Sequence, residues 1–309
     1  MCRIYDVVIV GSGAAGYTAA IYTARARLDT VLIEGTSRGG ALMATSVVEN
    51  YPGVPDPTTG PLLMEQMRVQ AQRLGAHLQS QQVDAFTLDG DVKTVAAGQK
   101  IWHARTVILA MGSAPRGLGD VPGGQALRGR GITATAKSDG LVLRDHDVAV
   151  VGGGGAAMEE ALFAAGMARN VTLIHRRNEF RSSAITIARI RAHHRITVLT
   201  DTEVTAVLGE RRVTGLRLRE LSTGAERELP VSAVVVAIGH VPRSELLTGR
   251  LDVDASGYVL TRDGTTHTSV DGVFAAGDLV DRRYRQAVTA AASGCAAALD
   301  AERWLAQRR

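Results

Sequence analysis

Apolar residues along this chain form one pattern that occurs twice. Residues 5–10 make an apolar strand, followed by a glycine-rich turn and an alanine-rich helix to about residue 26. A second apolar run, residues 30–33, ends in Glu34. A strand, a helix and a second strand in this order predict a β-α-β unit with parallel strands and a right-handed crossover.

The second copy of the pattern begins near the middle of the chain. Residues 147–151 form an apolar strand, four glycines follow, and an alanine-rich stretch predicts a helix to about residue 168. Residues 171–174 then form a strand that ends in His175. Two β-α-β units with glycine turns indicate two nucleotide sites, and hence two Rossmann-like domains.

The predicted fold class is α/β, with two Rossmann-like dinucleotide-binding domains, the second inserted in the first. Linkers are expected near residues 115–122 and 239–245, where prolines and glycines gather. The first domain is therefore expected to comprise residues 1–115 and 244–309, and the second domain residues 116–243.

Length and composition favour a cytoplasmic enzyme. The chain has 309 residues, 45% of them hydrophobic, which is enough for two domains with cores of their own. No apolar run reaches the roughly 20 residues of a membrane helix. The chain enters its first strand at once, which leaves no room for a signal peptide. We expect a cytoplasmic location and no membrane association.

Charge and cysteine content exclude several other classes. The net charge is +4, but the basic residues are scattered and aromatic residues make up only 4%, so nucleic-acid binding is not expected. The two cysteines, Cys2 and Cys295, form no local motif, and no Cys/His spacing indicates a metal site. Cys295 lies among small residues, where a buried, inert thiol is the default.

The first glycine turn has the spacing of a dinucleotide site. Gly11 permits the tight turn, Gly13 lets a pyrophosphate approach the backbone, and Gly16 lets helix and strand pack closely. Glu34 follows about 20 residues later, where an acid accepts hydrogen bonds from ribose hydroxyls. The alternative is a glycine-rich turn with a surface glutamate.

The second glycine turn favours NADPH over NADH. Its strand ends in His175, Arg176 and Arg177, with Arg181 one turn later, where an NAD site carries an acid. Arginines bind a 2′-phosphate with charge-assisted hydrogen bonds of about 1.5–3 kcal/mol each. The alternative is a solvated basic turn.

Together these motifs resemble the low-molecular-weight thioredoxin reductases, of the type found in high-GC Gram-positive bacteria, from end to end. The segments that carry the resemblance are residues 39–43, 49–53, 110–112, 131–140, 175–181, 238–242, 272–278 and 284–287. The resemblance implies FAD at the first site and NADPH at the second. It would place FAD at Gly11, Ser12, Gly13, Ala14, Ala15, Gly16, Glu34, Gly40, Leu42, Asn50, Val83, Ala110, Gly112, Gly277, Asp278, Arg285, Gln286 and Ala287. It would place NADPH at Gly152, Gly154, Ala156, Ala157, His175, Arg176, Arg177, Arg181, Ile238 and Gly239. Gly155 departs from the family, which has Asp or Asn there.

The largest departure from the family lies in residues 131–140. The family carries its redox-active cysteine pair at the positions of Thr135 and Ser138. Hydroxyls cannot cycle through a disulfide, so the resemblance implies a paralogue that lacks Cys-x-x-Cys. Asp139 corresponds to the acid that protonates the departing thiol in the family. It is either an acid/base for a different substrate or the cap of a turn.

These observations lead to the expectation of an NADPH-dependent FAD oxidoreductase with an electron acceptor other than a disulfide. Thr135, Ser138 and Asp139 would line the pocket of that acceptor or small-molecule substrate, and a redox step of specialised metabolism is one such reaction. Thioredoxin reduction is not expected. The alternatives are a ferredoxin/flavodoxin–NADP reductase-like enzyme and a non-catalytic FAD-binding pseudoenzyme or redox sensor. The family is homodimeric, so a homodimer is expected.

Overall fold

The chain divides into two compact units. The computed structural model describes residues 3–45, 48–136, 143–262 and 264–308. One unit comprises Met1–Ala114 and Val241–Arg309, and the other comprises Pro115–His240. Each unit contains a sheet in which several strands are parallel, with a glycine turn and a helix after one of its inner strands. The predicted α/β fold with two Rossmann-like domains is therefore confirmed.

The first unit is built on a seven-stranded sheet in the order β3-β2-β1-β6-β5-β4, with β17 paired to β6. Its strands are β1 (Ile4–Val10), β2 (Thr30–Ile33), β3 (His77–Gln79), β4 (Ala85–Thr87), β5 (Lys93–Ala97), β6 (Lys100–Leu109) and β17 (Val273–Ala275). Strands β1, β2, β3, β6 and β17 run parallel, whereas β5 pairs antiparallel with both β6 and β4.

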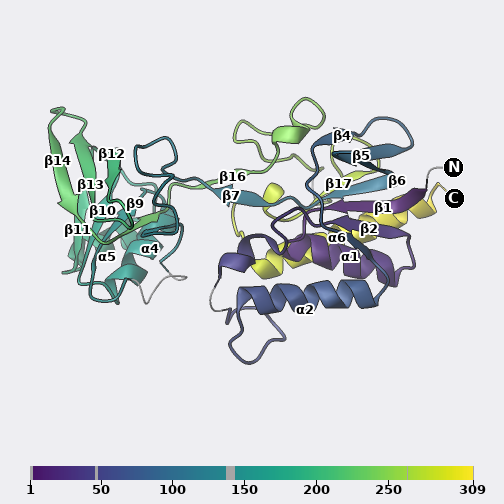
Figure 1. Ribbon diagram of the computed structural model, residues 1–309, viewed down its shortest axis with the longest axis horizontal. Helices are drawn as coiled ribbons and strands as arrows, with labels where there is room; N and C mark the ends of the chain where they lie inside the picture. Colours follow the sequence, from purple (N-terminus) through teal and green to yellow (C-terminus); the bar gives the residue numbers. More distant parts are fainter. Residues whose placement is uncertain (1–2, 46–47, 137–142, 263, 309) are drawn as a thin grey trace. The chain divides into compact units, whose positions relative to one another are not determined.

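The helices α1 (Ala14–Arg25), α2 (Gly60–Arg73) and α6 (Ala287–Ala306) lie together beside this sheet (Figure 1). Successive residues of β1 point to opposite faces, so Val7 and Ile9 pack in the cluster with the helices. Val8 and Val10 pack in a second cluster on the other face. Both faces are buried, which explains why β1 is apolar at successive positions rather than alternating.

Small residues bring the two ends of the chain together in the first unit. Helices α1 and α6 pack closely, and a Cβ added at Gly294 would lie 2.1 Å from the carbonyl oxygen of Ala15. A Cβ at Gly277 would lie 2.9 Å from the Cβ of Ala15. The run of small residues around Cys295 therefore serves the contact with α1, and the Cys295 side chain is partly exposed rather than buried.

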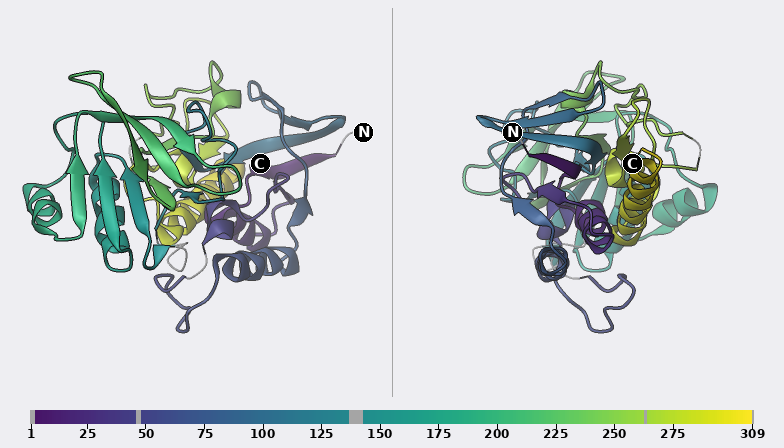
Figure 2. Two further views of the ribbon diagram at one scale, coloured as in Figure 1. Left: turned by 60° about the vertical axis from the view of Figure 1, so that its left-hand side comes forward. Right: turned by 90° about the vertical axis from the view of Figure 1, so that its right-hand side faces the viewer.

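The second unit has a five-stranded parallel sheet in the order β11-β10-β9-β15-β8 and a three-stranded antiparallel sheet, β12-β13-β14 (Figure 2). Its elements are β8 (Ile132–Thr133), β9 (Asp147–Val151), α4 (Gly155–Ala165), β10 (Asn170–Ile174), α5 (Ala184–Ala192), β11 (Ile196–Leu199), β12 (Thr202–Leu208), β13 (Gly215–Glu220), β14 (Glu226–Pro230) and β15 (Ala233–Val236). Helix α4 ends at Ala165 rather than near residue 168, because the chain turns at Gly166.

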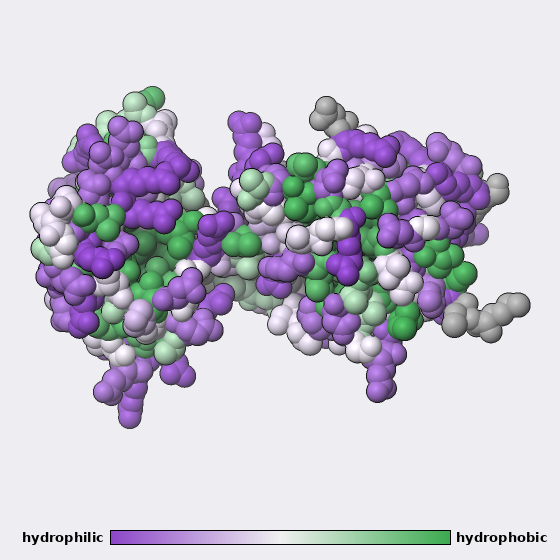
Figure 3. All heavy atoms as spheres, turned by 90° about the horizontal axis from the view of Figure 1, so that it is seen from above, coloured by the Kyte–Doolittle hydropathy of each residue, from purple (hydrophilic) through white to green (hydrophobic). Residues whose placement is uncertain are grey.

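Short elements complete the chain. The segments that connect the units, β7 (Ser113–Pro115) and β16 (His240–Pro242), pair with each other. Three 3-10 helices are η1 (Gly40–Ala44), η2 (Glu245–Leu247) and η3 (Gly277–Leu279). Among the described residues, no helix has the length and apolar character needed to cross a membrane. Hydrophilic residues cover much of the face seen in Figure 3, with smaller apolar patches between them.

Candidate functional site

The first glycine turn has the shape that a bound pyrophosphate requires. Gly11 has a φ of +108°, and a Cβ there would lie 2.3 Å from the carbonyl oxygen of Ala110. A Cβ at Gly16 would lie 1.7 Å from the carbonyl oxygen of Gly11. Gly13, by contrast, faces open space with no atom within 4 Å of an added Cβ. It is the N-cap of α1, which has no side-chain cap. The open backbone and the helix N-terminus fit the pyrophosphate of FAD.

Glu34 lies in a network that the sequence did not indicate. Its side chain is fully buried and accepts hydrogen bonds from Tyr17 Oη (2.8 Å), Arg68 Nε (2.8 Å) and Ser80 Oγ (3.0 Å). Burial, reinforced by the bond to Glu34, raises the pKa of Tyr17, and the same carboxylate raises the pKa of Arg68. Glu34 is therefore already bound by three donors of its own chain. Its predicted contact with a ribose stays a prediction.

The other amino-terminal residues predicted to bind FAD lie in different surroundings. Gly40 packs on the glycine turn, since a Cβ there would lie 3.0 Å from the Cα of Gly13. Ala110 directly follows β6 and contacts Gly11, and Gly112 comes two residues later with a φ of +69°. Val83 is different, because its side chain is buried in the cluster on the far face of the sheet. Ser12 Oγ donates to the Glu34 carbonyl (2.7 Å) and accepts from Gly39 N (3.0 Å), so its role is to hold neighbouring turns.

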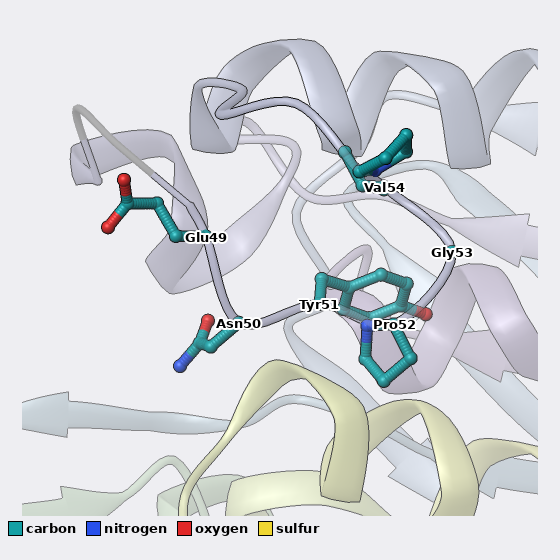
Figure 4. Close-up of a pocket in the computed structure, with 7 residues that line it drawn as sticks. Glu49, Asn50, Tyr51, Pro52, Gly53 and Val54 are labelled. Atoms are coloured by element: carbon teal, nitrogen blue, oxygen red, sulfur yellow. The ribbon is translucent and has the colours of Figure 1, made fainter.

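A loop after η1 surrounds a hollow of about 600 Å³ (Figure 4). It is lined by Glu49, Asn50, Tyr51, Pro52, Gly53, Val54 and Pro55. Asn50 Nδ2 donates to Gln286 Oε1 at 3.3 Å, so two residues predicted to bind FAD meet although 236 positions separate them. Burial raises the pKa of Tyr51. The loop and the start of α6 therefore belong to one site within the first unit.

Asp278 fits a ligand that donates hydrogen bonds. It lies in η3 directly after β17, at the carboxyl edge of the parallel sheet. Burial, together with the negative charge of Asp281, raises the pKa of Asp278 to about 6. No protein donor within the described residues forms a hydrogen bond to its carboxylate. Hydroxyl groups of a ribityl chain would supply the missing donors.

The second glycine turn repeats the geometry of the first. A Cβ at Gly152 would lie 2.4 Å from the carbonyl oxygen of Ala237, whereas Gly154 and Gly155 face open space. Gly154 is the N-cap of α4, again without a side-chain cap. Ala157 is completely buried against the strands, as the close-packing position of the fingerprint requires.

His175 has a contact that the sequence did not indicate. A Cβ at Gly153 would lie 2.2 Å from the imidazole ring, so only glycine fits beneath His175. The ring stacks on Phe180 at a centroid distance of 5.4 Å, and Arg181 N donates to the carbonyl of Gly153 at 2.7 Å. Burial lowers the pKa of His175. Stacking thus fixes the turn that precedes the arginines.

The arginines predicted to bind a 2′-phosphate remain available to solvent. Arg176, Arg177 and Arg181 are exposed, and none forms an ion pair among the described residues. Ile238 is 40% exposed, and Gly239 has a φ of +101° with open space around it. Exposed, uncommitted guanidinium groups beside a glycine turn fit the phosphates of NADPH.

Thr135 is anchored to α4 by a residue that the sequence analysis missed. Its Oγ1 donates to Glu160 Oε1 at 2.8 Å, and Ala136 N donates to Glu160 Oε2 at 2.5 Å. Thr133 Oγ1 donates to the carbonyl of Thr135 at 3.1 Å. Ser138 and Asp139 lie outside the described residues. The hydroxyl at position 135 therefore joins its segment to the helix that follows the second glycine turn.

Comparison with known proteins identifies a family and several relatives of this chain. Residues 5–294 match the family model described as pyridine nucleotide-disulphide oxidoreductase. A thioredoxin reductase of Mycolicibacterium smegmatis is 58% identical over 99% of this chain and 98% of its own length. A bifunctional thioredoxin reductase/thioredoxin of Mycobacterium leprae is 56% identical over 98% of this chain and 66% of its own length. The crystal structure of Lactococcus lactis thioredoxin reductase is similar with a TM-score of 0.81 and 31% identity, covering 98% of this chain and 99% of the other.

These relatives correct one expectation. We expected an acceptor other than a disulfide, with a ferredoxin reductase-like enzyme or a pseudoenzyme as alternatives. Relatives that are 47–58% identical over 99% of this chain are named thioredoxin reductases, so the expectation is wrong. It depended on two positions, Thr135 and Ser138, whereas the similarity extends over nearly the whole chain.

Proposed function

The chain belongs to the thioredoxin reductase family of the pyridine nucleotide-disulphide oxidoreductases, and on this premise we propose that it transfers electrons from NADPH to the disulfide of a thioredoxin. It is an FAD- and NADPH-dependent oxidoreductase, as the two glycine turns predicted. When bound, NADPH supplies a hydride to FAD, and FAD supplies two electrons to a disulfide. The observation that carries the proposal is the 58% identity to a thioredoxin reductase over 99% of the chain.

Thioredoxin as the partner is supported by the bifunctional relative. Its name joins a thioredoxin reductase and a thioredoxin in one protein, and this chain matches 66% of that protein's length. We infer a thioredoxin as the substrate of this chain. We also infer a homodimer, as the family resemblance indicates, and a cytoplasmic location.

The chain's own residues hold the cofactors in this proposal. The open face of Gly13 and the N-terminus of α1 bind the pyrophosphate of FAD, and Asp278 accepts hydrogen bonds from its ribityl hydroxyls. Arg176, Arg177 and Arg181 bind the 2′-phosphate of NADPH. Each contact orients a reacting ring without taking part in the chemistry.

The route of the electrons differs from that of the family in this proposal. Thr135 and Ser138 replace the family's cysteine pair, and the only cysteines are Cys2 and Cys295. The thioredoxin disulfide itself then takes up two electrons and two protons, its S–S bond breaks, and two thiols form, with no disulfide of this chain between them. Asp139 is the residue we propose as the donor of a proton to the departing sulfur.

A cysteine-free variant tests this proposal. The double variant C2S/C295S removes both sulfhydryl groups of the chain. We expect it to reduce thioredoxin with NADPH at the wild-type rate, measured anaerobically as thiols formed per NADPH consumed. A D139N variant should slow the same reaction while NADPH still bleaches the flavin absorbance. Loss of thiol formation in C2S/C295S would instead assign the relay to a cysteine of this chain.

A further inference from the structure

One carboxylate, that of Asp281, organises the turn between the two carboxyl-terminal stretches predicted to bind FAD. Its Oδ1 accepts hydrogen bonds from the backbone N–H groups of Arg283 (2.8 Å) and Tyr284 (2.9 Å). Its Oδ2 accepts from the N–H of Arg285 (2.9 Å) and from Thr289 Oγ1 (3.4 Å). Burial opposes the charge, but the hydrogen bonds outweigh it and hold the pKa of Asp281 below its ordinary value. The ionised Asp281 side chain is therefore the acceptor of hydrogen bonds from four donors.

The Asp281 carboxylate fixes an unusual backbone conformation at Arg285. This residue has a φ of +49°, in the left-handed region that costs free energy for a residue with a Cβ. The hydrogen bond from its N–H to Asp281 holds it there. Gln286 follows as the N-cap of α6, and its N–H donates to Thr289 Oγ1 at 3.2 Å. The same carboxylate thus determines where α6 begins and where Arg285, Gln286 and Ala287 lie.

Asp281 is joined to the other stretch as well. Its backbone N–H donates to the carbonyl of Gly277 at 2.9 Å, which closes the turn around Asp278. Gly277 N in turn donates a hydrogen bond to Ser293 Oγ of α6 at 2.8 Å. The main chain of Asp281 therefore contacts one predicted FAD segment, and its side chain contacts the other.

We propose that Asp281 is the positioning residue of the FAD site: its carboxylate sets the Arg283–Arg285 turn and so presents Arg285, Gln286 and Ala287 to the cofactor in register with Asp278. The inference uses FAD as the cofactor but not the identity of the electron acceptor. Its test measures FAD binding, so its failure is distinguishable from a failure to reduce thioredoxin.

A plain structural cap would give a different result, and the chain offers a matched control. Asp300, toward the far end of α6, accepts hydrogen bonds from Thr266 N (3.1 Å) and Thr266 Oγ1 (2.8 Å). It ties a loop to the same helix but contacts no residue predicted to bind FAD. D300N and D281N therefore each remove one negative charge near α6, at opposite ends of the helix, and only D281N disturbs the proposed site.

The experiment titrates flavin-free D281A, D281N and D300N with FAD and follows the quenching of flavin fluorescence. We expect the Kd for FAD to rise about tenfold or more in D281A, equivalent to about 1.4 kcal/mol. D281N, which keeps one oxygen acceptor, should show a smaller rise and an altered visible spectrum of the bound flavin. D300N should bind FAD as the wild type does, whatever its effect on thermal stability.

A pH profile supplies a readout that a structural cap would not change. Asp278 faces the charges of Asp281 and Arg285. Removing the charge of Asp281 lessens the repulsion, so the midpoint of the pH dependence of FAD binding should move to lower pH in D281N. Wild-type affinity and an unmoved midpoint in D281N, with wild-type affinity in D281A, would overturn the proposal. Equal weakening of FAD binding by D300N would overturn it too.

Discussion

The Glu34 network allows a prediction in which the magnitude follows from the structure. The perturbation is R68M, which removes the guanidinium that lies 2.8 Å from Glu34 but keeps an unbranched apolar stem on α2. The Glu34 side chain is 0% exposed and the Arg68 side chain 18% exposed. The variant therefore leaves a buried carboxylate without its counterion.

The expected loss is large for a single substitution. Breaking a buried ion pair from one side costs about 3–5 kcal/mol. Tyr17 and Ser80 still donate to Glu34 in the variant, and Arg68 retains some contact with solvent, so we expect about 2–3 kcal/mol. For a domain of this size that corresponds to a fall in Tm of roughly 4–12 °C.

The assay is thermal unfolding of the flavin-free protein followed by circular dichroism, with R73M as the control. Arg73 lies on the same helix, is exposed, and forms no ion pair among the described residues. R73M should stay within about 0.5 kcal/mol of the wild type. If R68M unfolded at the same temperature as R73M, the view of Glu34 as a buried ion-pair partner would be refuted.

Three further predictions concern the cofactor sites. In the flavin-free state G11A should unfold at a lower temperature than the wild type, because its Cβ meets a carbonyl oxygen at 2.3 Å, whereas G13A should keep the wild-type Tm. G13A should nevertheless lose bound FAD. Thermal unfolding of the flavin-free proteins and the flavin content after purification distinguish the two. The pKa of Asp278 in the folded protein is about 6, above the ordinary value of 3.8, so ionisation of Asp278 opposes folding and the stability falls as the pH rises between these values. D278N should therefore stabilise the flavin-free protein at pH 7 by about 2–3 kcal/mol and lose that gain below about pH 4. Urea unfolding at both pH values measures the difference. R176A and R177A should each raise the Kd for NADPH by about 10- to 100-fold without changing that for NADH, measured by calorimetry; equal losses for both nucleotides would contradict a 2′-phosphate site.

The sequence predicted those parts of the fold in which local pattern and tertiary structure agree. The strand, turn and helix around Gly11 could be read directly, because buried parallel strands are apolar at successive positions and the turn needs glycine. The partners of Glu34 could not be read in this way. Arg68 lies 34 positions away on a helix of mixed polarity, and nothing in its neighbours distinguishes it from an exposed arginine such as Arg73.

The packing of a side chain against a glycine could not be predicted from the sequence either. The spacing of the second turn indicated a nucleotide, but not that the His175 ring lies over Gly153. The link from Thr135 to Glu160 was missed for a similar reason. The Thr135 hydroxyl cannot take part in redox chemistry but donates a hydrogen bond to Glu160, which lies 25 positions away, and no local pattern pairs the two residues.

The most direct test of the proposed function is anaerobic reduction of a thioredoxin by NADPH, comparing the wild type with the double variant T135C/S138C. The thiols formed on thioredoxin are counted against the NADPH consumed. We expect the wild type to form two thiols for each NADPH over many turnovers, and T135C/S138C to do so faster because a cysteine pair supplies a relay. The proposal would be contradicted if NADPH bleached the flavin of the wild type once and no thioredoxin thiols followed, while T135C/S138C turned over.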